Sequence, residues 1–249
     1  MSIKRVAVVD DHILFAEAMV VALVHRGYDA RCVVPSADAP TGGSLISQVL
    51  SGNPDVVLLD LDLGQAGDGL DLIVRLSSRA FVVVVTGNSD PVRIGAALAA
   101  GAATVISKSY PLEQILDTLT RLRDGLPAMA KEERERLVGH WRQQRQFDRE
   151  IKARFALLTT REGEVLGELM AGRQVSEIAR RSFVSESTVR TQVKAILAKL
   201  QVGSQLTAVG LAHRANWTPP AVVDVAHSRP RLPRQRVGSA LPARDNNPG

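Results

Sequence analysis

The chain has 249 residues, of which 45% are apolar and 23% are charged, a balance typical of globular proteins and long enough for two ordinary domains. Its single cysteine, Cys32, excludes an internal disulfide and a cluster of cysteine-bound metal. The apolar runs are too short to span a bilayer and the N-terminus has no signal-peptide pattern, so we expect a cytoplasmic protein without membrane contact.

The net charge of +5 divides unevenly along the sequence. Residues 1–125 contain 10 Lys/Arg and 14 Asp/Glu, whereas residues 126–249 contain 21 and 12. The net charge is therefore near −4 for the first half and near +9 for the second half. Such a split fits an acidic, cation-binding domain joined to a domain that binds nucleic acid, although the needs of solubility alone can also produce it.

Short β-branched runs alternate with helical stretches over the first half of the chain. Five of these runs are predicted to be strands: residues 3–9, 30–34, 56–59, 81–85 and 104–106. Continuous Val and Leu runs indicate strands that are buried on both faces, as in a parallel sheet covered by helices on both sides. We therefore expect residues 1–124 to form an α/β doubly wound (βα)₅ domain with a parallel five-stranded sheet.

Polar residues follow the strands at what would be one edge of this sheet. Asp10 and Asp11 end the first strand and Asp60 ends the third, so all three carboxylates face one crevice. Because carboxylates this close repel one another, we expect a hard divalent cation, Mg²⁺, among their oxygens. Such a cation favours attack of a carboxylate on phosphorus. Thr86 and Lys108 follow the fourth and fifth strands, where each can contact a phosphoryl group.

This pattern resembles the receiver domain of bacterial two-component response regulators over residues 1–124. By this resemblance the metal ligands are Asp10, Asp11, Asp60 and the main-chain carbonyl of Asp62. The same resemblance implies that the catalytic residues are Asp60 as phosphoacceptor, Thr86 as switch hydroxyl and Lys108 as phosphate-binding lysine. It also implies a sensor histidine kinase as the phosphoryl donor.

Three departures from the receiver pattern leave an alternative open. Gly64 stands where the family often has proline, with one added residue before Asp68, and Val105 stands where receivers usually carry Tyr or Phe. The alternative is a DNA-binding regulator whose receiver acts without phosphorylation. We also hypothesise that the acidic side chain of Asp62 alters the lifetime of the phosphorylated state.

Residues 125–157 are predicted to form a charged helical linker. Its apolar residues at heptad-like spacing are Leu137, Trp141, Ile151 and Phe155. Because Gln144 and Asp148 interrupt this seam, both a dimer helix and a solvated tether remain possible. Residues 218–249, rich in Arg and Pro, are expected to be disordered.

Residues 158–217 are expected to form an all-α, four-helix domain. Thr159 and Glu162 have the spacing of a capping box, and Ser185 is suited to cap a third helix. The apolar stripe of that helix comprises Val189, Val193, Ile196, Leu197 and Leu200. Its opposite face comprises Ser187, Arg190, Thr191, Lys194 and Ala198. A short helix, a turn and an N-capped helix with a face free of carboxylates are typical of a helix-turn-helix that enters a major groove.

This stretch resembles the DNA-binding domain of LuxR/NarL-type regulators. The matching pieces are Leu158-Thr159, Arg161-Glu162, Glu164-Val165-Leu166, Gly172, Glu177-Ile178-Ala179, Val184-Ser185, Thr188-Val189, Ile196, Lys199-Leu200 and Val202. The resemblance implies binding of double-stranded DNA through Arg190, Thr191 and Lys194, with Lys199 as a phosphate contact. It also implies that residues 204–214 form a dimerisation helix and that the active form is a homodimer.

An enzyme remains as a remote alternative. Asp60 and Asp62 after an apolar strand also resemble the nucleophile motif of haloacid-dehalogenase-like phosphatases. Those enzymes place the nucleophile on the first strand and an acidic pair after the lysine, whereas here the acidic pair comes first. The order of the residues therefore favours a regulator, and we expect no enzymatic turnover.

Overall fold

The computed structural model describes residues 3–35 and 42–219, so the predicted disorder of residues 220–249 lies outside the described part. Contacts between residues divide the chain into two compact units, Met1–Glu150 and Ile151–Gly249. The predicted linker is thus shared between the units, with residues 125–150 in the first and 151–157 in the second. No single helix in the described residues is long and apolar enough to cross a membrane, and one bent pair, Glu186–Leu200 with Gln205–Arg214, meets the criterion by length and composition only.

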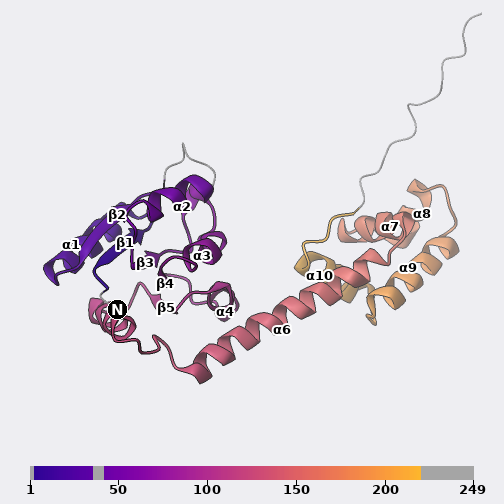
Figure 1. Cartoon of the computed structure of the whole chain (residues 1–249). Helices are drawn as coiled ribbons and strands as arrows, with labels where there is room; N and C mark the ends of the chain where they lie inside the picture. The colour runs from indigo at the N-terminus through magenta and orange to yellow at the C-terminus, as the bar shows by residue number, and fades with distance from the viewer. Residues whose placement is uncertain (1–2, 36–41, 220–249) are drawn as a thin grey trace, which may run out of the picture. The chain divides into compact units, whose positions relative to one another are not determined.

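The first unit contains a five-stranded parallel sheet with the order β2-β1-β3-β4-β5 (Figure 1). Its strands are β1 (Arg5–Val9), β2 (Asp29–Val33), β3 (Val56–Leu59), β4 (Phe81–Thr86) and β5 (Thr104–Ser107). All four neighbouring pairs are parallel. The doubly wound fold predicted from the sequence is confirmed, and each predicted strand agrees with an observed one to within two residues at either end.

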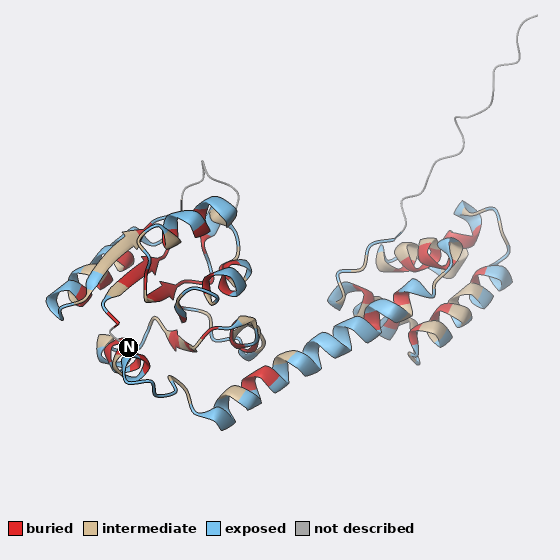
Figure 2. Cartoon of the chain, viewed as in Figure 1, coloured by how far each residue is buried: buried red, intermediate tan, exposed pale blue. Residues whose placement is uncertain are grey.

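Two layers of helices cover the sheet, because successive side chains of a strand point to opposite faces. The helices of the unit are α1 (Ile13–His25), α2 (Gly42–Leu50), α3 (Leu70–Leu76), α4 (Pro91–Ala100) and α5 (Leu112–Arg123). Val6 and Val8 pack with buried residues of α1 and α5, whereas Ala7 and Val9 pack with those of α2, α3 and α4. Figure 2 shows the resulting buried sheet between exposed outer helix faces.

Helix α6 (Lys131–Ala156) begins on the first unit, where its first turns pack on α4 and β5. Leu137 and Val138 are buried against Leu98, with Trp141 partly buried beside them. The Arg134 guanidinium donates hydrogen bonds to main-chain oxygens of the α4–β5 connection, at 2.8 Å (Leu98), 2.9 Å (Ala102) and 3.2 Å (Ala103). The start of the linker is therefore a docked part of the first unit.

The two interpretations of the linker seam both need correction. Leu137 is buried in the first unit, while Ile151 and Phe155 are buried in the core of the second. Only the stretch between these ends, residues 142–150, is exposed throughout (Figure 2). The seam residues are thus covered within the chain itself, so they form neither a continuous dimer stripe nor a wholly solvated tether.

Over its described residues, 151–219, the second unit has a helical core built from the end of α6 and four further helices. These are α7 (Thr160–Met170), α8 (Val175–Arg181), α9 (Glu186–Leu200) and α10 (Gln205–Arg214). The predicted capping box is present, since Thr159 accepts from the Glu162 amide and Glu162 accepts from the Thr159 amide. Ser185 caps α9 by accepting from the Thr188 amide. Phe155 stacks on Trp217 with ring centroids 5.3 Å apart, which closes the core near the end of the described chain.

Candidate functional site

The carboxyl ends of β1 and β3 bring together the three aspartates predicted from the sequence, here called the acidic cluster (Asp10, Asp11 and Asp60). Ligand atoms of these aspartates and of His12 all lie within 4.8 Å of one another. Asp10 and Asp60 are only 2% and 3% exposed. Their burial follows from the parallel register, in which Val9 of β1 lies opposite Leu59 of β3 and both strands end together.

Lys108, directly after β5, reaches into this cluster. Its Nζ lies 2.6 Å from Asp60 Oδ2 and 2.7 Å from Asp10 Oδ2, and 4.9 Å from the centre of the Phe15 ring. Burial disfavours the charged ammonium, but hydrogen bonds and attraction from Asp10 and Asp60 outweigh it and raise the pKa of Lys108. The lysine is therefore a fixed positive charge beside the predicted phosphoacceptor.

The acidic cluster fits a hard divalent cation. Asp11 Oδ1 is buried and has no hydrogen-bond partner among the residues that the structure describes, although His12 Nδ1 lies 2.8 Å away and would attract it once protonated. Lys108 supplies one positive charge to three carboxylates, which leaves an excess of negative charge. Mg²⁺ prefers oxygen ligands and binds through one or two carboxylates with water or phosphate oxygens, so the donors present suit it.

Thr86 ends β4 at the same edge and is 1% exposed. Its Oγ1 accepts a hydrogen bond from the Asn88 amide at 3.2 Å. The structure thus brings together Asp10, Asp11, Asp60, Thr86 and Lys108 at one end of the sheet, as the sequence predicted; their roles in catalysis remain predictions.

The loop after Asp60 explains one departure from the receiver pattern. Gly64 has φ +56°, a conformation closed to proline, and a Cβ at this position would lie 2.9 Å from Asp11 Oδ2. The loop then returns toward β3, because the Gly69 amide donates to the Leu61 carbonyl at 2.8 Å. An isolated bridge pairs Asp62 with Asp68. The conformation of this loop thus depends on glycine at position 64.

Helix α9 presents the face that was predicted to enter a major groove. Its predicted members, Ser187, Arg190, Thr191, Lys194 and Ala198, are all exposed. On the opposite side Val189, Ile196 and Leu200 are buried. Arg190 donates to Glu186 one turn earlier at 3.1 Å, an exposed pair that is worth only about 0.3–0.5 kcal/mol and so opens readily.

Lys199 has a structural partner that the sequence did not reveal. Its Nζ lies 2.6 Å from Oε2 of Glu162, the buried carboxylate of the capping box. Burial would raise the pKa of Glu162, but Lys199 and the Thr159 amide hold it below its ordinary value. Lys199 therefore links α9 to the start of α7, and its contact with a DNA phosphate stays a prediction.

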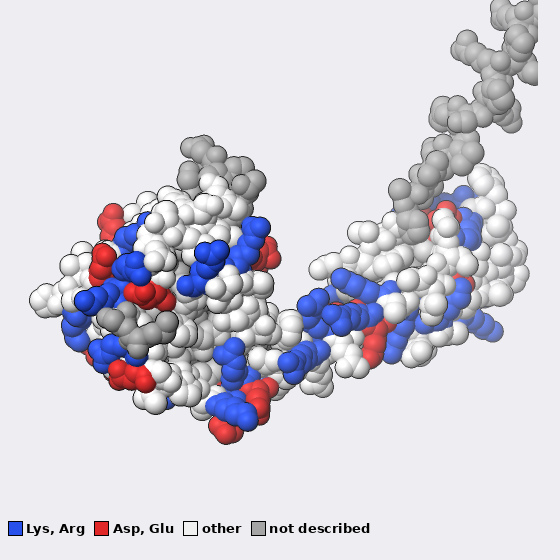
Figure 3. Space-filling view, viewed as in Figure 1, with Lys and Arg blue, Asp and Glu red and all other residues white. Residues whose placement is uncertain are grey.

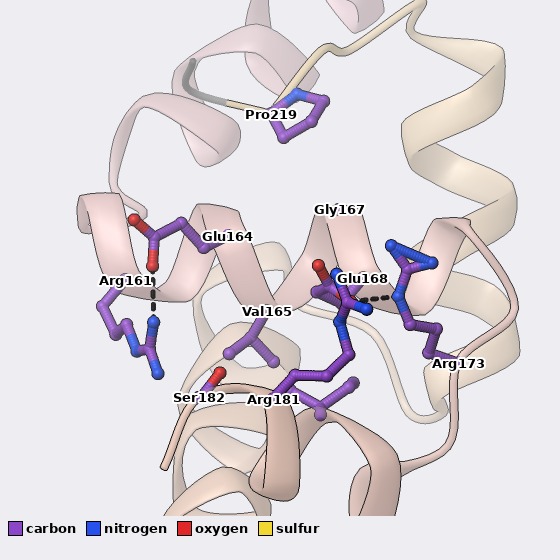
Figure 4. A pocket seen from close by; sticks show the side chains of 10 residues that line it. Arg161, Glu164, Val165, Gly167, Glu168, Arg173, Arg181, Ser182 and Pro219 are labelled. Carbon is purple, nitrogen blue, oxygen red and sulfur yellow. Dashed lines mark hydrogen bonds and ion pairs between the residues drawn. The ribbon is translucent and has the colours of Figure 1, made fainter. Parts of the chain in front are cut away.

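A cleft of about 550 Å³ is lined mainly by residues of α7 and α8 and by no residue of α9 (Figure 4). Arg161 pairs with Glu164 at 2.7 Å, while Glu168 pairs with both Arg173 and Arg181. Because these opposite charges largely cancel, the cleft is a network of ion pairs rather than a concentrated basic surface.

Basic side chains nevertheless dominate the second unit. Residues 151–219 contain 10 Lys/Arg and 5 Asp/Glu. Figure 3 shows Lys and Arg over this unit with fewer acidic side chains between them, whereas the first unit mixes both signs. This excess of positive charge favours binding to a polyanion.

Sequence reasoning missed two side chains around the acidic cluster. Arg93 of α4 donates hydrogen bonds to the loop after Asp60, and Phe15 of α1 lies under the Lys108 ammonium. Both contacts join residues far apart in the chain, and neither residue stands at a strand end. No periodicity or strand-end rule could have found them.

A doubly wound domain with an acidic cluster and a facing lysine, followed by a helix-turn-helix domain, defines the class of two-component response regulators. Residues 6–120 match the family described as the response regulator receiver domain, and residues 156–212 match the bacterial regulatory proteins of the luxR family. The chain belongs to the response regulators that combine these two domains.

Its relatives are transcriptional regulators, and the similarity extends over most of the length of each. The chain is 31% identical over 218 residues to the probable transcriptional regulatory protein NarL of Mycobacterium tuberculosis, covering 84% of this chain and 94% of the relative. It is 31% identical over 206 residues to the nitrate/nitrite response regulator protein NarP of Escherichia coli, covering 82% and 92%. A solved structure of the response regulator ChrA of a heme-sensing two-component system is 25% identical, with coverage of 87% and 99% and a TM-score of 0.45.

These matches decide between the regulator and the phosphatase. The relatives are transcriptional regulators, and a LuxR-type DNA-binding domain occupies the second unit. The chain is therefore a two-component response regulator and not an enzyme of the haloacid-dehalogenase type.

Proposed function

We propose that phosphorylation of Asp60 by a sensor histidine kinase switches the binding of double-stranded DNA by α9. The observation that supports this most is the contact of Lys108 with both Asp10 and Asp60 inside the buried acidic cluster. The Lys108 ammonium in this position can neutralise one oxygen of a phosphoryl group that is transferred to Asp60. We further propose that the protein acts in the cytoplasm and as a homodimer when active.

The residues divide the phosphoryl transfer between them. A carboxylate oxygen of Asp60 forms the new bond to phosphorus while the bond from phosphorus to the donor's imidazole nitrogen breaks, and that nitrogen keeps the electron pair and is then protonated. Mg²⁺, held by Asp10, Asp11, Asp60 and the main-chain carbonyl of Asp62, would supply positive charge to the phosphoryl oxygens. Lys108 then pairs with a phosphoryl oxygen, and the Thr86 hydroxyl donates to another.

The consequence for DNA binding is a shift between two populations of the protein. Phosphorylation favours the form in which two copies place their α9 helices on adjacent half-sites. On each half-site, Arg190 and Thr191 contact base edges while Lys194 and Lys199 contact phosphates. The phosphoryl donor kinase, the homodimer and the contacts with DNA all belong to this proposal.

Val105 supports a second candidate, a receiver that acts without phosphorylation. Its side chain packs against the α4 and α6 residues of the first unit and is aliphatic where receivers usually have an aromatic ring. A switch that depends on such a ring would be missing here. The two candidates differ in whether Asp60 must be modified before DNA binds.

Incubation of the protein with Mg²⁺ and acetyl phosphate tests both candidates. We expect one phosphoryl group in the intact mass of the wild type and none in Asp60→Asn. DNA selected by the phosphorylated protein from a random duplex library then serves as the probe, and phosphorylation should tighten binding at constant salt. A phosphorylated protein that binds this DNA no better than the unmodified one would favour the phosphorylation-independent receiver.

A further inference from the structure

Arg93, in the first turn of α4, contacts three acceptors on the loop that follows the predicted phosphoacceptor. The two N–H groups of one nitrogen, Nη2, are shared among the Leu61 carbonyl at 3.1 Å, Asp62 Oδ1 at 2.9 Å and Asp68 Oδ1 at 3.1 Å. The Arg93 side chain is 25% exposed. The two ends of the loop, Asp62 and Asp68, are thereby held by one guanidinium.

The loop has anchors of its own in the buried Leu61 and Leu63 side chains, but its middle is built on glycine. Gly64 and Gly67 have φ of +56° and +103°, and glycine has the weakest torsional preferences of any residue. The Leu63 amide reaches the Gly67 carbonyl only at 3.3 Å. The Asp62–Asp68 bridge and the hydrogen bond from the Gly69 amide to the Leu61 carbonyl close the loop, and the Arg93 contacts connect it to α4.

Helix α4 does not need Arg93 for its own start. Asp90 caps it by accepting from the Val92 amide at 3.0 Å, and Pro91 occupies the first turn. Both features stabilise a helix N-terminus without help from the loop. The contacts of Arg93 therefore serve the loop rather than the helix.

We propose that Arg93 is a positioning residue that fixes the main chain around Asp62, so that its carbonyl completes the oxygen ligands of the divalent cation. This inference rests on the proposed function of the acidic cluster. Partners of metal ligands act in this way in many sites, because they orient the ligand before the metal binds. Arg93 holds the carbonyl of the preceding residue, Leu61, and the carboxylate of Asp62 itself, and so restrains the main chain that carries the Asp62 carbonyl.

The sign of the effect separates positioning from simple electrostatics. Arg93 is a cation near the site, so its removal makes the surroundings more negative and by charge alone should strengthen Mg²⁺ binding. Loss of positioning should weaken Mg²⁺ binding instead, because the loop must then be ordered at the expense of binding free energy. The proposal requires the second effect to be larger.

Isothermal titration of the full-length, unphosphorylated protein with MgCl₂ measures this directly. We expect Arg93→Gln to raise the dissociation constant about tenfold, the effect typical of losing a partner of a metal ligand. Arg93→Lys keeps the charge, but its ammonium ends one bond short of the Nη2 position, so it should fall between wild type and Arg93→Gln. Arg75→Gln, which removes an equal charge from the exposed side of α3, is the control and should bind like wild type.

The outcomes are distinct. Arg93→Gln with unchanged or tighter Mg²⁺ binding overturns the proposal. Arg93→Lys with the affinity of wild type also overturns it, because the contacts that the shorter side chain loses would then be dispensable. The lysine variant also keeps the test decisive if the glutamine variant does not fold. A wild-type protein that binds no Mg²⁺ overturns the proposed function itself, whereas normal wild-type binding with an unaffected Arg93→Gln overturns only the role of Arg93.

Discussion

Replacing Gly95 by alanine should loosen the first turns of α6 from α4, even though alanine is the better helix former. A Cβ on Gly95 would collide with the Leu137 carbonyl oxygen and lie 2.9 Å from the Trp141 Cβ. Non-bonded carbon atoms settle at about 3.5–4.0 Å. Helix α6 must therefore move away by a distance on the order of 1 Å.

The energetic balance follows from the contacts that this movement disturbs. Alanine gains about 1 kcal/mol over glycine as a helix residue. Against this, overpacking of a close contact costs about 1–3 kcal/mol. The displacement also strains the hydrogen bonds from Arg134 to α4 and its C-terminal connection, each worth about 1.5–3 kcal/mol because the donor is charged. We expect the docked state of α6 to lose about 1 kcal/mol or more.

Gly139 supplies a matched control within α6 itself. A Cβ on Gly139 meets nothing within 4 Å, so Gly139→Ala should raise the stability of the docked helix by about 1 kcal/mol. The same chemical change at Gly95 and Gly139 is thus expected to have opposite signs.

The assay follows Trp141, which is partly buried in the α4–α6 contact. In a Trp217→Phe background it is the single tryptophan, and its emission should shift to longer wavelength in Gly95→Ala but not in Gly139→Ala. Amide hydrogen exchange over residues 134–141 should accelerate in the same variant. Gly95→Ala with raised stability and unchanged protection of these amides would refute the reasoning.

Three further predictions concern the second unit. Lys199 and Thr159 lower the pKa of Glu162 from its ordinary 4.5, so the ionised carboxylate stabilises the fold above pH 4.5, and this contribution is lost as the pH falls through the lowered pKa. Glu162→Gln should therefore be about 1–2 kcal/mol less stable at neutral pH and should show a flatter acid denaturation profile by circular dichroism. Arg190→Ala should relax base preference at one position, by about 1–3 kcal/mol, in DNA selected from a random library, and a uniform loss over all sequences would contradict its role. Lys199→Ala should lower the melting temperature, because it leaves buried Glu162 without its cation. If Lys199 also contacts a DNA phosphate, the slope of log binding constant against log salt concentration, measured well below that temperature, should fall in magnitude by about 0.9.

The sequence was sufficient for those features that depend on strand ends and helix periodicity. Continuous Val runs identified the buried parallel strands, and parallel strands necessarily place their carboxyl ends at one edge, which brought Asp10, Asp60 and Lys108 together. The capping box of Thr159 and Glu162 was visible for a similar reason, because its partners are three residues apart. Local spacing determines these features, so no tertiary information was needed.

Contacts between distant residues were not visible in the same way. Arg93 lies 25 residues from Asp68, and Lys199 lies 37 from Glu162, so no periodic pattern connects them. Gly95 did carry a signal, since an isolated glycine in an alanine-rich helix costs stability and usually has a packing reason. The packing reason for Gly95 is its close contact with α6, and the sequence showed only that the α6 segment is charged, not where it packs.

Val105 and the docking of α6 are best understood as one feature of the fold. The Val105 side chain packs both against the core beneath α4 and against the cluster that contains Leu137 and Trp141. A large aromatic ring at position 105 would compete with Leu137 and Trp141 for this contact surface, which α6 covers in the present fold. The departure at Val105 therefore does not leave the α4–β5 face bare. It accompanies a different cover for that face, in which the aromatic side chain comes from Trp141 of the linker.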